Sequence, residues 1–161
     1  MKYRGRKRIQ EIGIMVDARA KGQRGEYLVR DMLRKYTRLS FERVPSSGAL
    51  SYLKGDLYVP HAKNRYCIEV KNYEASPLSD KIFTAPKTNN LIKWWKKLVI
   101  QAERGNQLPM LFFKYNRSPV FIVTQREPGY PEYMYISLLD CYVSLAEEWL
   151  TMEKVEFLNG V

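Results

Sequence analysis

Two acids and one lysine stand at the ends of two neighbouring apolar runs. Asp56 opens the run 57–59, and Glu69 and Lys71 lie two residues apart near the end of the run 66–71. Because side chains alternate along a strand, Glu69 and Lys71 share one sheet face, and a turn between the runs would bring Asp56 beside them. Two carboxylates and an amine would then meet at the end of a strand.

Such a cluster contains the groups that phosphodiester hydrolysis needs. Divalent cations such as Mg²⁺ bind one or two carboxylates, take water and phosphate in their other positions, and stabilise charge at the phosphate. Asp56 and Glu69 supply carboxylates, the Val70 carbonyl adds an oxygen, and Lys71 could position or help deprotonate the water. The alternative is that Asp56 is a turn acid and that Glu69 and Lys71 form the polar face of a half-exposed strand. Taken alone, the motif favours this second interpretation.

Composition restricts the classes of protein and of site. The chain of 161 residues with 45% apolar content fits one domain with a real core. A formal net charge of +10 favours a polyanionic partner, with nucleic acid ahead of an anionic membrane surface. The lone histidine, His61, argues against zinc sites and histidine triads. The absence of a long apolar run and of a signal peptide predicts a soluble cytoplasmic protein.

Positive charge is concentrated near the N-terminus. Residues 1–40 carry +8 of the net +10, and we expect residues 1–18 to form a basic arm and residues 19–161 a single domain. The arm would either follow a phosphate backbone or remain a solvated tail, and composition does not choose between these alternatives. In the first case its DNA-binding residues would be Lys2, Arg4, Arg6, Lys7 and Arg8.

The remaining chain alternates helical and strand patterns. Apolar residues at steps of three and four predict helices over 18–36, 86–104 and 137–152. Short apolar runs bounded by turn residues predict strands over 41–44, 55–59, 65–71, 108–115, 120–124 and 133–136. The second and third of these should pair as a hairpin. This order predicts an α/β fold with a mixed central sheet of about five strands flanked by helices.

Three motifs, taken in order, resemble the PD-(D/E)xK nuclease superfamily. Gly55-Asp56 followed by Glu69-Val70-Lys71 resembles its signature, with Gly55 where the name has proline. The segment 21–26 resembles the opening helix of archaeal-type Holliday junction resolvases, and the segment 43–48 resembles their Arg-x-Pro-x-Ser-Gly loop. By themselves Glu26 is most simply a helix acid and the serine-rich loop a turn. Together the motifs imply a restriction-endonuclease-like fold.

What the resemblance implies is a homodimeric, Mg²⁺-dependent endonuclease that cuts four-way DNA junctions symmetrically, with Mn²⁺ able to substitute. Such an enzyme would serve DNA recombination and repair. The catalytic residues would be Glu26, Ser47, Asp56, Glu69 and Lys71. The metal ligands would be Glu26, Asp56, Glu69 and the carbonyl of Val70. DNA contacts outside the arm would be Lys21, Arg24, Arg43, Ser46 and Lys54.

Two departures from the resolvase pattern leave particular roles open. Tyr27 stands where some relatives have arginine after the helix glutamate, which leaves one DNA contact open. The loop before Asp56 varies in length among them, so Ser46, Ser47 or Ser51 could take the serine role. The alternatives are another PD-(D/E)xK nuclease that cuts linear or branched DNA, a non-catalytic nucleic-acid-binding protein, or an RNA-processing enzyme.

Overall fold

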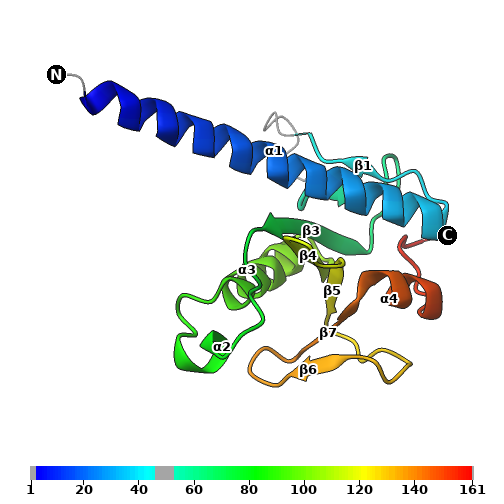
Figure 1. Cartoon of the computed structure of the whole chain (residues 1–161). Helices are drawn as coiled ribbons and strands as arrows, with labels where there is room; N and C mark the ends of the chain where they lie inside the picture. The colour runs from blue at the N-terminus through cyan, green and yellow to red at the C-terminus, as the bar shows by residue number, and fades with distance from the viewer. Residues whose placement is uncertain (1–2, 46–52, 161) are drawn as a thin grey trace.

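A mixed seven-stranded sheet forms the centre of the described part of the chain, with strands in the order β1-β2-β3-β4-β5-β7-β6 (Figure 1). This computed structural model describes residues 3–45 and 53–160, and of residues 3–16 it describes the backbone alone. The strands are β1 (Glu42–Arg43), β2 (Leu57–Tyr58), β3 (Tyr66–Tyr73), β4 (Leu108–Tyr115), β5 (Phe121–Thr124), β6 (Met134–Ile136) and β7 (Cys141–Leu145). The helices are α1 (Tyr3–Thr37), α2 (Lys81–Thr84), α3 (Asn90–Arg104) and α4 (Ala146–Met152).

Helices cover both faces of the sheet, so the predicted α/β architecture is confirmed (Figure 1). Alternation along β3 sends Ile68 and Val70 into the core beneath α1 and α4, whereas Cys67 packs on the opposite side with α3. β3 and β4 are parallel and joined through α3, and the other neighbouring strands are antiparallel. The predicted hairpin is present, with Leu57 of β2 opposite Ile68 of β3.

The helix α3 follows the periodicity seen in the sequence. Leu91, Trp95 and Leu98 recur at steps of three and four and are buried against the sheet, so this tryptophan belongs to the core. The helix starts later than proline 86, because the side chain of Asn89 accepts a hydrogen bond from the Ile92 N–H and caps the N-terminus. None of the helices in the described residues is long and apolar enough to cross a membrane.

The predicted helix 137–152 was wrong in its N-terminal part. The expected helix 137–152 is divided, because residues 141–145 form β7 between β5 and β6 and only α4 is helical. A strand with neighbours on both edges and apolar surroundings gives a nearly continuous apolar run, which resembles a buried helix. The unpredicted strand β7 brings the sheet of the described residues to seven strands, more than the predicted number of about five.

The first helix begins much earlier than predicted. α1 has 35 residues, a length of about 50 Å, and its N-terminal part extends past the sheet in Figure 1. No change of secondary structure separates residues 3–18 from residues 19–37 in the described chain. The division into a basic arm and a single domain at residue 18 therefore stays a prediction.

Candidate active site

β3 has an open edge just beyond its short partner β2. The register pairs β2 with β3 at Leu57 and Ile68, and the Asp56 N–H donates to the Ile68 carbonyl at 2.7 Å. The next outward-facing amide on this edge, Val70 N–H, finds no strand and donates instead to Oδ2 of Asp56 at 2.7 Å. The side chain of Asp56 thus closes the ladder and is fixed at the place where the strand ends.

Gly55 allows Asp56 to reach this position. Its backbone is in the left-handed region, with φ of +83°, which glycine adopts without steric cost. A Cβ atom here would lie 2.5 Å from the Ile68 carbonyl oxygen, which is the acceptor of the Asp56 amide. This turn therefore requires glycine at position 55.

Glu26 belongs to α1, and α1 packs closely against β3. Gly25 faces Asn72 so closely that a Cβ would lie 2.8 Å from the Asn72 Cβ, whereas Gly22 has open space around it. The Asn72 side-chain amide also donates to the Lys21 carbonyl at 2.9 Å. Of the two glycines, Gly25 is thus the one that permits the helix–strand contact that brings Glu26 to the edge of the sheet.

The four predicted residues line one pocket of about 670 Å³. Asp56, Glu69, Lys71 and Glu26 all face it, together with Val70 of the strand between them. Nζ of Lys71 lies 3.3 Å from a carboxylate oxygen of Glu69. Alternation places Glu69 and Lys71 on the α3 side of β3 and Glu26 on the α1 side, so the groups meet around the open edge and not on one face.

Burial and crowding of acids set the protonation of Asp56. Desolvation, followed by the nearby Glu69 carboxylate, raises the pKa of Asp56 to about 7 from 3.8, although the Val70 amide opposes the shift. A bound cation would relieve both effects, because its positive charge would stabilise the ionised form of these partly buried acids. The pocket is thus electrostatically suited to a hard cation.

The donor atoms fit a divalent ion of the Mg²⁺ type. Asp56, Glu69 and the Val70 carbonyl offer oxygen ligands at one edge, and the carbonyl points outward with the amide that binds Asp56. Among the described residues no three acidic, histidine or cysteine side chains are already close enough to enclose an ion. Two carboxylates with water and substrate phosphate are sufficient for Mg²⁺, so this arrangement matches its usual protein sites.

We expect wild-type stability in EDTA to fall as pH rises from about 4 to about 7, because folding holds a proton on Asp56 more tightly than the unfolded chain does. The cost of ionising Asp56 is absent below its unfolded pKa of 3.8 and complete above about 7. Asp56→Asn keeps an oxygen for the Val70 amide and should raise the free energy of unfolding by about 1 to 3 kcal/mol near pH 8, but not near pH 4.

Urea unfolding across this pH range measures the difference. Glu103→Gln is the matched control, because it removes one negative charge from an exposed position at the end of α3. If the free energy of unfolding changes equally with pH in the wild type and in Asp56→Asn, the pKa of Asp56 is not raised by folding.

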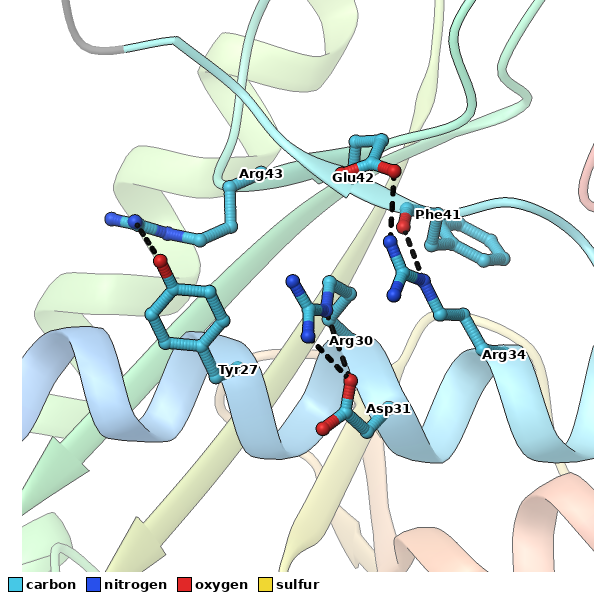
Figure 2. Close-up of polar contacts among 7 residues, drawn as sticks. All are labelled: Tyr27, Arg30, Asp31, Arg34, Phe41, Glu42 and Arg43. Atoms are coloured by element: carbon cyan, nitrogen blue, oxygen red, sulfur yellow. Dashed lines mark hydrogen bonds and ion pairs between the residues drawn. The ribbon is translucent and has the colours of Figure 1, made fainter.

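Glu26 has a second partner, Arg43 of β1. The Arg43 Nε donates to Oε2 of Glu26 at 2.7 Å, and its Nη1 donates to the Tyr27 hydroxyl at 3.1 Å. The bond to Glu26 raises the pKa of Arg43. Figure 2 shows Arg43 reaching from β1 toward the Tyr27 ring on α1. Arg43, which was predicted to contact DNA, thus forms an ion pair with Glu26, which was predicted to bind metal.

The other residues predicted to contact DNA lie at several separate places. Lys21 lines the pocket and its amine bonds to Asn116, while Arg24 is exposed on α1. Lys54 lines a separate cavity with Tyr66 and Gln107. The predicted residues Lys2, Ser46, Ser47 and Ser51 lie outside the described residues, as do the side chains of Arg4, Arg6, Lys7 and Arg8.

Sequence reasoning missed two residues that organise the site. Asn72 joins α1 to β3, and the only signal for it was an amide directly after Glu69-Val70-Lys71. Tyr27 appeared as a departure from the resolvase pattern, and its contact with Arg43 depends on a strand far away in sequence. A long-range contact of this kind has no periodicity that could reveal it.

Comparison with known proteins agrees with the motifs. Residues 17–156 match the model of the family described as "Phage putative PDDEXK endonuclease". Protein D14 of Escherichia phage T5 is 44% identical over 108 residues, which are 63% of this chain and 67% of that protein. A solved structure of a Holliday junction resolvase from Archaeoglobus fulgidus has a TM-score of 0.43 and 17% identity, covering 80% of this chain and 91% of that one. The family match spans most of the chain, which therefore belongs to this phage PD-(D/E)xK endonuclease family and is a nuclease.

Proposed function

We propose that this nuclease resolves four-way DNA junctions by symmetric, Mg²⁺-dependent phosphodiester hydrolysis, acting as a homodimer. The observation that carries the chemistry is the joint placement of Asp56, Glu69, Lys71 and Glu26 around the open edge of β3. Nucleases of this superfamily generally use divalent metal ions, and the choice of Mg²⁺, with Mn²⁺ as a substitute, follows from the oxygen ligands.

Each residue would have a distinct role in the reaction. Asp56 and Glu69 would hold the metal ion with the Val70 carbonyl, and Glu26 would complete the site from α1. When bound, the ion supplies charge stabilisation at the phosphate and a more acidic water. Lys71, 3.3 Å from Glu69, would orient the attacking water and stabilise the charge that develops on the phosphate.

Support for junction selectivity comes from the order of the motifs in the sequence. The segments 21–26 and 43–48 resemble those of junction resolvases and precede the Asp56 motif in the same order. A four-way junction has two equivalent strands to cut, and a two-fold dimer presents two equivalent sites to them. The strong positive charge of residues 1–40 would hold the DNA by its backbone.

The test compares a fixed four-way junction with a linear duplex formed by one of its strands and the full complement of that strand. With Mg²⁺ we expect paired nicks near the junction centre, little cutting of the duplex, and no cutting in EDTA. Equal cutting of both DNAs would retain the nuclease and overturn junction selectivity. A protein that binds but never cuts with Mg²⁺ or Mn²⁺ would be a non-catalytic binder, and preferential cutting of a matched RNA would indicate RNA processing. Sedimentation of the protein alone and with the junction determines whether it is a dimer.

A further inference from the structure

Arg43 is attached to the site by two chemically different contacts. One is its ion pair with Glu26, at 2.7 Å. The other is Tyr27, whose hydroxyl accepts a hydrogen bond and whose ring centre lies 4.8 Å from the guanidinium carbon (Figure 2). The first contact depends on the negative charge of Glu26, whereas the second is neutral and would persist if that charge were taken by another cation.

Glu26 faces the same pocket as Asp56 and Glu69. A divalent ion held there would compete with Arg43 for the Glu26 carboxylate and would repel the guanidinium. Arg43 is able to respond, because its side chain is partly exposed and its partner Glu26 lines the pocket. Among the described residues its Nη2 has no hydrogen-bond partner, so donors remain for a phosphate.

We propose that metal binding releases Arg43 from Glu26 to bind a backbone phosphate of the DNA, and that Tyr27 is the positioning residue that keeps Arg43 at the mouth of the pocket during this exchange. The inference rests on the proposed metal-dependent function of the pocket. It gives Tyr27 a role, because its ring on α1 holds an arginine that comes from β1.

A second arginine keeps β1 in place during the exchange. Arg34 donates to the Phe41 carbonyl and to the Glu42 carboxylate, each at 2.8 Å, and thereby ties the start of β1 to α1 (Figure 2). Neither Phe41 nor Glu42 lines the pocket that contains Asp56 and Glu69. A metal ion would therefore change the partner of Arg43 without detaching the strand that carries it.

Arg30 provides an internal comparison. Its guanidinium carbon is also 4.8 Å from the Tyr27 ring centre, but its carboxylate partner is Asp31, which does not line the pocket. Arg30 thus has the same aromatic neighbour as Arg43 without a link to the metal site. Its contribution to DNA binding should not change when metal is added.

The experiment measures binding of a fluorescent four-way junction by anisotropy, in EDTA and in Ca²⁺, with no cleavage readout. Tyr27→Leu should weaken binding about 5-fold in Ca²⁺ and less than about 2-fold in EDTA, where Glu26 still holds Arg43. Arg43→Gln should show the same metal dependence. In the Arg43→Gln background, Tyr27→Leu should add nothing, because the two residues act as one unit.

Three further variants separate positioning from a general structural effect. Tyr27→Phe, which keeps the ring and removes only the hydroxyl bond, should lose about 2-fold in Ca²⁺ and covers the case in which Tyr27→Leu folds poorly. Tyr135→Leu is the matched control, since Tyr135 is 48% exposed against 42% for Tyr27 but lies on β6. Arg30→Gln should have equal effects with and without Ca²⁺.

Equal losses for Tyr27→Leu in EDTA and Ca²⁺, additive effects with Arg43→Gln, or a metal-dependent loss for Arg30→Gln would each overturn the inference. Its failure is distinguishable from failure of the proposed function. If the wild type cleaves DNA but the loss of junction binding in Tyr27→Leu is the same in EDTA and Ca²⁺, only the inference about Tyr27 is rejected. Metal-dependent coupling in a protein that never cuts DNA rejects the proposed function alone.

Discussion

Asp56→Asn should reduce the rate of strand cleavage by at least about 1,000-fold while DNA binding in EDTA stays equal or becomes tighter. The carboxylate of Asp56 is fixed beside β3 by the Val70 amide, which donates to it at 2.7 Å. Asparagine keeps that hydrogen bond but loses the charge that a metal ion needs. Removal of a negative charge beside the DNA cannot weaken the attraction for phosphate.

The same substitution should increase stability above neutral pH, which separates loss of chemistry from loss of fold. An inactive protein that unfolds at higher urea concentration than the wild type cannot be inactive because it is misfolded. Single-turnover cleavage in Mg²⁺ and junction anisotropy in EDTA are the two measurements, with Glu103→Gln as the charge-matched control on α3. Retention of cleavage within about 10-fold would show that Asp56 is not a ligand of the proposed metal ion.

Gly55→Pro, which restores the superfamily's name residue, should abolish cleavage instead of improving it. Proline fixes φ near −65°, whereas Gly55 has φ of +83°. Gly55→Ala should also fail, since its Cβ would lie 2.5 Å from the Ile68 carbonyl oxygen and would disrupt the Asp56–Ile68 hydrogen bond. We expect each substitution to lower the free energy of unfolding by about 2 to 4 kcal/mol.

Gly160→Ala is the matched control for this backbone strain. Gly160 also has a positive φ, +73°, but a Cβ there would meet only the flexible side chain of Lys63, at 4.0 Å. It should cost about 1 kcal/mol and leave cleavage unchanged. Urea unfolding and single-turnover cleavage of the three variants test the expectation. An active Gly55→Pro variant would show that Asp56 reaches β3 by a different turn.

Local patterns in the sequence predicted those elements whose own residues carry enough information. The strand 108–115 matches β4 at both ends, and the hairpin between β2 and β3 follows from the turn between two apolar runs. The spacing of Asp56, Glu69 and Lys71 along adjacent strands was enough to bring them together in one pocket. In these cases the interactions are between near neighbours in the chain, so alternation and turn residues describe them well.

Only the tertiary structure decided the features that depend on distant segments. β7 is a strand because β5 and β6 pair with its two edges, and Glu26 reaches the site because Gly25 packs against Asn72. The link from Glu26 to Arg43 likewise joins a helix to a strand 17 residues away. Contacts of this kind are set by packing geometry across the fold, which leaves no period in the sequence. The sequence thus determined which groups could perform the chemistry, and the open edge of β3 decided how they meet.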